Sequence, residues 1–214
     1  MIKACIFDLD GVIVDTAHYH FMAWQRLAKE LGVALTEKEN ERLKGVSRMS
    51  SLEIILGLGG IRLGEAEKEK LAEKKNAWFV EYVHAMKPDE IFPGVKKLIL
   101  DLKNMGIKVG LASSSRNADT VIRRLKIQTE FETVVDGNMV VHSKPDPEIF
   151  LLAAKKLGVG PSSCVVFEDA EAGVEAALRA GMKCVGVGSA EQLGKANLIV
   201  KKTADFDTTK LNTL

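Results

Sequence analysis

Two aspartates two residues apart, Asp8 and Asp10, follow an apolar run near the start of the chain. In an extended strand, side chains two apart project to the same side, so both carboxylates would face one site. One carboxylate can then serve as nucleophile or metal ligand while the other carries a proton. The alternative of an EF-hand calcium loop fails, because the loop positions that require Gly and Glu hold Ile13 and Tyr19.

Two later strand-like runs also end in polar residues. Ser113 follows one of them, and the pair Glu168 and Asp169 follows the other. Since ligands bind at the carboxyl ends of strands in open parallel sheets, we expect these groups to converge with Asp8. Asp and Ser also start turns, which is the simpler explanation for any single case, but three clusters together favour a common site. A site so rich in carboxylate oxygens suits Mg²⁺.

An anionic reaction among these carboxylates needs positive charge beyond that of Mg²⁺. Lys144 is the candidate, because it follows a strand-like run and precedes Pro145 and Pro147, which hold the chain extended before the next helix. The alternative is a solvated surface lysine. The position favours a functional role.

The elements that position these residues alternate between short β-rich runs and helical patterns, which predicts parallel βαβ units. The predicted strands cover residues 3–7, 108–112, 133–135, 164–167, 183–187 and 198–200. The helical patterns between them include residues 118–125, 147–157 and 171–180. The predicted fold class is therefore α/β, with a Rossmann-like parallel sheet.

One stretch interrupts the alternation, because residues 16–86 show helical patterns and no convincing strand. Thr36 to Glu39 and Ser50 to Glu53 both have the form of a capping box, which predicts a helix start at each. Residues 65–86 indicate one long amphipathic helix. We therefore expect an inserted helical cap domain at residues 16–91, called here the cap segment, and an α/β core made of residues 1–15 and 92–214.

Four short motifs occur in order along the chain: Asp8-x-Asp10-Gly11, Ser113, Lys144-Pro145 and Glu168-Asp169. They resemble the motifs of the haloacid dehalogenase superfamily of phosphotransferases, including its inserted helical cap. The resemblance implies that Asp8 forms an aspartyl phosphate and that Asp10 is the general acid and base. It also implies catalytic roles for Ser113 and Lys144. The implied ligands of Mg²⁺ are Asp8, the Asp10 main chain, Glu168 and Asp169.

Two helices of the cap segment carry polar residues on apolar stripes. His20 lies on the same stripe as Trp24, whereas His18 is about 200° away around the helix, so the two histidines cannot share a metal. Lys75 lies within the apolar stripe of the long helix, where an unpaired charge is costly. A role facing the active site and a side chain that extends to the surface both remain open for Lys75.

A second anion site is predicted beside the first. Arg48 can bind a phosphate through two parallel hydrogen bonds, and Gly45 lets the backbone approach a ligand closely. In the core, Ser115, Arg116 and Asn117 precede a helix whose N-terminal amides suit anions. Two anion sites would fit a bisphosphate.

The cap and linker signatures of the β-phosphoglucomutase family resemble residues 8–24, 43–48 and 75–76 of this chain. This resemblance implies interconversion of β-D-glucose 1-phosphate and glucose 6-phosphate through β-glucose 1,6-bisphosphate. It also assigns substrate contacts. Arg48, Ser115, Arg116 and Asn117 would hold the phosphate that is not transferred, Gly45, Val46 and Trp24 would line the sugar site, and Ser51, His20 and Lys75 would support it. Arg116 stands where the family often has lysine.

Two rival functions remain at this point. A sugar-phosphate phosphatase would use the same core with water as acceptor, and a regulatory protein would keep the fold without catalysis. The composition narrows the partners: 30 basic and 29 acidic residues give a net charge of +1. This balance argues against nucleic acid or a membrane surface and leaves a small sugar phosphate. Because no targeting or membrane-spanning pattern is present and the three cysteines lack pairing motifs, we expect a cytoplasmic protein. We expect a monomer, because no coiled-coil or long apolar surface pattern demands a partner.

Overall fold

The computed structural model describes residues 1–214, except for the side chain of Asn212. Within these residues, parallel strands form one sheet in the order β3-β2-β1-β4-β5-β6. The strands are β1 (Ala4–Phe7), β2 (Lys108–Ala112), β3 (Thr133–Val135), β4 (Cys164–Glu168), β5 (Lys183–Val187) and β6 (Leu198–Val200). The strand order reverses between β1 and β4, and this switch point is where an open α/β sheet forms its binding crevice. The predicted α/β, Rossmann-like fold is confirmed.

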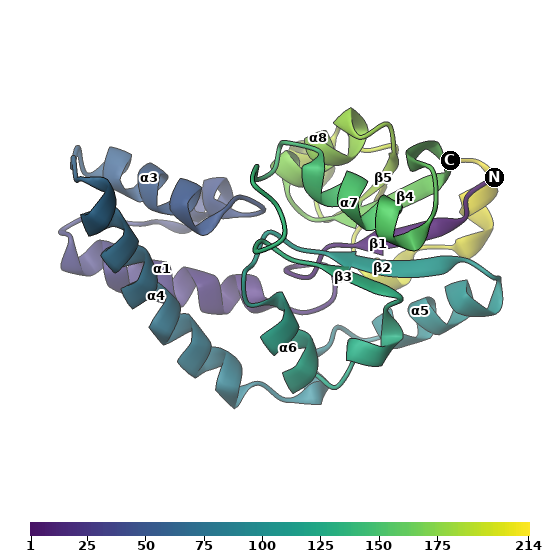
Figure 1. Ribbon diagram of the computed structural model, residues 1–214, viewed down its shortest axis with the longest axis horizontal. Helices are drawn as coiled ribbons and strands as arrows, with labels where there is room; N and C mark the ends of the chain where they lie inside the picture. The colour runs from purple at the N-terminus through teal and green to yellow at the C-terminus, as the bar shows by residue number, and fades with distance from the viewer.

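Helices cover both faces of the sheet (Figure 1). Because side chains alternate along a strand, Cys5 and Phe7 of β1 face one way and Ala4 and Ile6 the other. The face with Phe7 packs against α5 (Val95–Asn104) and α6 (Ala118–Arg124). The face with Ile6 packs against α7 (Glu148–Leu157) and α8 (Glu171–Arg179). Every predicted strand and core helix is present, with each end within one residue of its predicted position.

The cap segment lies beside the sheet and contains α1 (Thr16–Glu30), α2 (Glu37–Asn40), η1 (Glu41–Leu43), α3 (Arg48–Leu58) and α4 (Glu65–Ala85). In Figure 1 these helices occupy the left of the view, with α1 running close to α4. Their shared interior includes the fully buried side chains of Leu27, Ile55 and Phe79. The same buried cluster continues into the sheet face that carries Phe7, so the cap segment and the core share apolar packing.

The two predicted capping boxes have different outcomes. The first is confirmed: the Glu39 amide donates to Thr36 Oγ1 at 3.3 Å, and the Thr36 amide donates to Glu39 Oε2 at 2.8 Å. The second prediction is wrong, because α3 begins at Arg48 rather than after Ser50. Ser47 is its N-cap and accepts a hydrogen bond from the Ser50 amide at 3.1 Å. Ser47 thus provides a hydrogen-bond acceptor for the Ser50 amide, which has no backbone acceptor in the first turn of the helix.

The two chain passages between core and cap segment run next to each other. Val14 forms an antiparallel bridge with Ile91, and the Phe92 amide donates to the Ile13 carbonyl at 2.9 Å. The remaining elements are short: η2 (Pro88–Glu90), η3 (Gln128–Glu130), η4 (Pro161–Ser163), α9 (Ala190–Leu193), η5 (Thr203–Asp205) and η6 (Thr208–Asn212). Across the described residues, the helices are too short or too polar to cross a bilayer.

Candidate active site

Asp8 lies at the switch point, immediately after β1. Its amide donates to the Phe167 carbonyl of β4 at 2.9 Å, and the Asp10 amide donates to Asp8 Oδ2 at 2.9 Å. The chain then turns sharply at Gly11, whose φ is +75°. A Cβ on Gly11 would lie 2.0 Å from Asp169 Oδ2. Glycine is therefore required for this turn to approach the acidic residues after β4.

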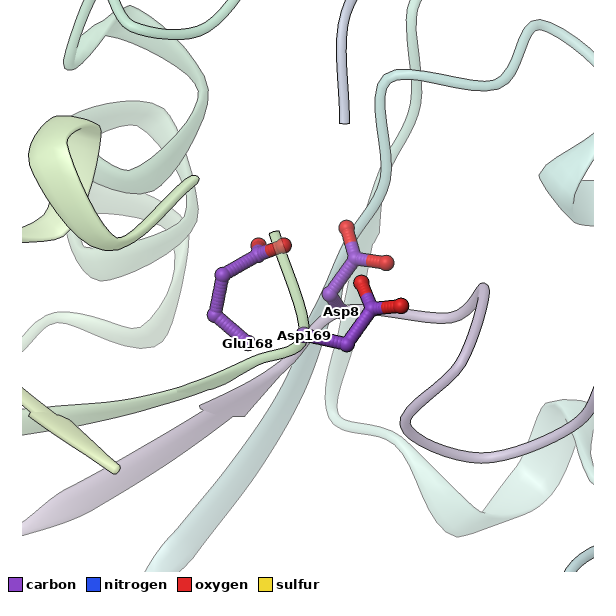
Figure 2. A group of neighbouring side chains, drawn as sticks. All are labelled: Asp8, Glu168 and Asp169. Carbon is purple, nitrogen blue, oxygen red and sulfur yellow. The ribbon is translucent and has the colours of Figure 1, made fainter. Parts of the chain in front are cut away.

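Three carboxylates meet at the ends of β1 and β4 (Figure 2). Asp8, Glu168 and Asp169 each offer an oxygen within 4.8 Å of the others. Burial, and then the nearby Glu168 and Asp8 carboxylates, raise the pKa of Asp169 well above its usual range. A divalent cation would relieve this repulsion, and an all-oxygen donor set fits a hard ion such as Mg²⁺. The residues present therefore fit a metal, and the carboxylate of Asp10 lies outside this group.

Lys144 is enclosed between two of these carboxylates. Its Nζ donates to Asp8 Oδ1 at 2.5 Å and to Glu168 Oε2 at 2.8 Å, and its side chain is fully buried. Although burial lowers the pKa of Lys144, the Asp8 and Glu168 carboxylates more than offset this and raise it. For Glu168, burial outweighs the attraction of Lys144 and raises its pKa to about 7. The alternative of a solvated surface lysine is therefore wrong, because the Lys144 side chain is fully buried between these two carboxylates.

Asp10 has a different environment from Asp8. Burial, and then the neighbouring Asp8 carboxylate, raise the pKa of Asp10 to about 8. The hydroxyl of Thr16, the buried first residue of α1, donates to Asp10 Oδ1. A carboxyl group with a pKa near neutral pH is suited to both giving and accepting a proton. Thr16 was missed from the sequence, where it carries no signal beyond its place at a helix start.

A pocket between the cap segment and the core opens onto Asp8, Asp10 and Asp169. All the residues predicted to bind substrate line it: His20, Trp24, Gly45, Val46, Arg48, Ser51, Lys75, Ser115, Arg116 and Asn117. Sequence reasoning missed five further lining residues: Ala17, Asn40, Leu43, Lys44 and Ser114. Ser113 is fully buried outside the lining, where its Oγ accepts a hydrogen bond from the Ser115 amide at 3.2 Å.

Two guanidinium groups line the same pocket. Arg48, at the start of α3, is partly buried, and Arg116 is exposed at the rim. Burial, and then the like charge of Arg116, lower the pKa of Arg48. Two guanidinium groups that line one pocket are suited to binding an anion. Ser51 supports this part of the pocket, because its hydroxyl donates to the Ser47 carbonyl at 3.1 Å.

Lys75 and His20 connect the two long helices of the cap segment. Lys75 Nζ lies 2.7 Å from His20 Nδ1 and 4.5 Å from the centre of the Trp24 ring. Only 1% of Lys75 is exposed, so the surface-directed alternative is wrong. Burial, and then Arg48, lower the pKa of Lys75, while burial, and then Lys75, lower the pKa of His20. An unprotonated His20 Nδ1 can therefore accept the hydrogen bond from Lys75.

The site has an aspartate pair after the first strand and a buried lysine beside that pair, and a helical segment is inserted between β1 and β2. These features define a phosphoryl-transfer enzyme of the haloacid dehalogenase type. Residues 2–181 match the family described as haloacid dehalogenase-like hydrolases, and the chain belongs to that family.

Individual relatives extend the comparison over nearly the whole chain. It is 47% identical over 206 residues to a β-phosphoglucomutase of Bacillus subtilis, covering 95% of this chain and 91% of that one. It is 38% identical over 200 residues to a phosphorylated carbohydrates phosphatase of Thermotoga maritima, covering 92% and 90%. The crystal structure of a β-phosphoglucomutase from Clostridium difficile is similar, with a TM-score of 0.95 and 45% identity, covering 100% of this chain and 96% of the other.

Proposed function

We propose that the protein interconverts β-D-glucose 1-phosphate and glucose 6-phosphate through an aspartyl phosphate and β-glucose 1,6-bisphosphate. The observation that carries this proposal is one pocket lined by two groups of residues that are each suited to phosphate. Asp8 and Asp169 of the carboxylate cluster line this pocket, and so do Arg48 and Arg116. We assign the carboxylates to one end of the pocket and the two arginines to the other. A phosphatase needs only the first end. The similarity to β-phosphoglucomutases supports the same choice.

In the proposed mechanism, Asp8 attacks phosphorus, and a new O–P bond forms as the ester bond to the sugar breaks. Asp10 gives its proton to the departing sugar oxygen and later removes one from the hydroxyl that accepts the phosphoryl group. Lys144 neutralises the Asp8 carboxylate as the anionic phosphate approaches, and Ser113 supports the loop beside it. Mg²⁺, held by Asp8, the Asp10 main chain, Glu168 and Asp169, would neutralise charge on the transferred group.

The second end of the pocket would hold the phosphate that is not being transferred. Arg48, Ser115, Arg116 and Asn117 are the proposed ligands there. The sugar would lie between the ends, against Gly45, Val46 and Trp24, with Ser51, His20 and Lys75 behind them. The bisphosphate must turn over between the two half-reactions so that each phosphate in turn reaches Asp8.

We further propose that residues 16–91 act as a cap domain on a core of residues 1–15 and 92–214, and that closure keeps water from the aspartyl phosphate. The protein would act as a monomer in the cytoplasm. Three free, buried cysteines fit a reducing compartment. Light scattering in solution tests the monomer.

One assay tests the proposed reaction. β-Glucose 1-phosphate, a trace of the bisphosphate and Mg²⁺ are supplied, and glucose 6-phosphate and free phosphate are followed together. We expect glucose 6-phosphate to dominate, and Asp8→Asn to abolish its formation. Dominant release of free phosphate would instead establish a phosphatase. Absence of both products and of a phosphoenzyme would point to a non-catalytic protein.

A further inference from the structure

Two side-chain hydrogen bonds join the cap segment to the core loop that follows β2. The Ser114 hydroxyl donates to the carbonyl of Gly45, which lies in the loop before α3, at 2.9 Å. Asn117 Nδ2 donates to Asn76 Oδ1 of α4 at 2.7 Å. Two separate parts of the cap segment thus contact one short stretch of the core. We call these two hydrogen bonds the clasp.

Close backbone packing accompanies the clasp. Gly45 has a φ of +70°, and a Cβ there would lie 2.8 Å from the Cβ of Ala170, at the start of α8. The carbonyl of Gly45 therefore reaches Ser114 only while the cap loop is pressed against the core. Any opening of the pocket that separates this loop from the core must break the Ser114 bond.

The clasp uses groups that the proposed chemistry leaves free. Ser114 and Asn76 have no part in phosphoryl transfer, in metal binding or at the proposed phosphate subsite. The side-chain amide of Asn117 donates one of its two hydrogens to Asn76, so the other hydrogen remains available to a phosphate. This amide group thereby links the proposed phosphate subsite to the position of α4.

We infer that Ser114 and Asn76 are positioning residues whose hydrogen bonds hold the cap segment closed, so that the sugar rather than water receives the phosphoryl group. This inference rests on the proposed mutase function. A neutral hydrogen bond of this kind changes an equilibrium by roughly 2- to 12-fold. Loss of either bond should shift the balance between closed and open molecules by that factor.

The first test measures the cap position directly. Exposed Lys70 of α4 and Lys155 of α7 are replaced by cysteine for a fluorescent donor and acceptor, since the native cysteines are buried. In the ligand-free full-length protein, Asn76→Ala and Ser114→Ala should each raise the ratio of open to closed molecules roughly 2- to 12-fold. Unchanged ratios in both variants would overturn the inference.

Two further variants separate the clasp from a general structural effect. Asn76→Asp keeps an oxygen acceptor at the same place, so it should retain the closed population that Asn76→Ala loses. Gln192→Ala removes another cap–core hydrogen bond, from Gln192 Nε2 to Glu41 Oε2 at 3.3 Å, which is exposed to solvent. Because water replaces its partner, this variant should leave the ratio unchanged. Equal opening in all variants would contradict the inference.

The second test measures how the phosphoryl group is partitioned. The free phosphate released per glucose 6-phosphate formed should rise roughly 2- to 12-fold in Asn76→Ala and Ser114→Ala and stay constant in Gln192→Ala. If the distance between the two labels changes but the release of free phosphate does not, Ser114 and Asn76 have no role in keeping water from the phosphoryl group. Failure of the proposed function is a distinct result, because the unaltered protein would then release mainly phosphate.

Discussion

Lys144 is a buried cation whose partners are both carboxylates, so its removal would leave Asp8 and Glu168 without a counter-charge. For Lys144→Ala without metal, we expect the free energy of unfolding to fall by about 3–5 kcal/mol, as when one partner of a buried ion pair is lost. Denaturant titration at neutral pH measures it. Lys97→Ala is the matched control, because Lys97 forms an exposed pair with Asp101 at 2.6 Å. A change above about 1 kcal/mol in the control, or none in Lys144→Ala, would contradict this expectation.

His20 predicts a dependence of stability on pH. Its pKa is lowered in the folded protein by burial and by Lys75, whereas the unfolded chain binds a proton near the ordinary value of 6.5. The unfolded state therefore takes up more protons than the folded state below pH 6.5. The contribution of His20 to the free energy of unfolding is complete above pH 6.5 and is lost as the pH falls. Between pH 6.5 and 5.5 the loss is at most about 1 kcal/mol.

Buried carboxylates with raised pKa values increase the free energy of unfolding as the pH falls, which is opposite to the effect of His20. The contribution of His20 is therefore measured by comparing the parent protein with a variant that lacks this histidine. His20→Asn places an amide oxygen where Nδ1 accepts from Lys75 and removes the titration. The difference in unfolding free energy between the parent and this variant should narrow as the pH falls from 6.5 to 5.5. A constant difference across that range would show that His20 does not titrate as described.

At the scale of elements, the loop before α3 depends on Gly45. A larger side chain meets Ala170 and also requires a left-handed backbone, which costs about 1–2 kcal/mol. We expect Gly45→Val to lower kcat/KM by roughly 5- to 30-fold by opposing closure. Gly57→Ala is the control, since nothing lies within 4 Å of its Cβ within α3, and it should keep full activity. Equal activity in both variants would contradict the close contact.

The same elements show how far the sequence predicts the structure. Strand ends were predictable because buried apolar runs stop at polar residues, as β1 does before Asp8. The start of α3 was not, because Ser47 and Ser50 are both acceptable N-caps and local sequence does not choose between them. The capping box at Thr36 had no such competitor.

The pocket residues also fall into those that the sequence predicts and those that it does not. Those in recognisable motifs, such as Arg48 and Arg116, were predicted to meet and do line one pocket. Asn40, Lys44 and Ser114 were not predicted, because they enter the lining only through the docking of the cap segment on the core. The burial of Lys75 could not be decided from α4 alone, since its partner His20 lies on α1.

At the scale of the whole molecule, the carboxylate cluster predicts that Mg²⁺ stabilises the fold. An ion that binds only the folded state, at 100 times its dissociation constant, adds about 2.7 kcal/mol to the free energy of unfolding. Denaturant titration with Mg²⁺ and with a chelator measures the difference. In Asp169→Asn the gain should be much smaller. An equal gain in both proteins would place the ion elsewhere.

The bridge between Val14 and Ile91 has a consequence for how such a protein can change. The insertion leaves and re-enters the core at adjacent points, so its length hardly affects the sheet. Each doubling of a closed loop costs only about 0.6 kcal/mol in chain entropy. Residues 17–90 can therefore be exchanged for another insertion while β1 to β6 and the contact between Thr16 and Asp10 remain, which makes this junction the natural place to graft a new substrate preference.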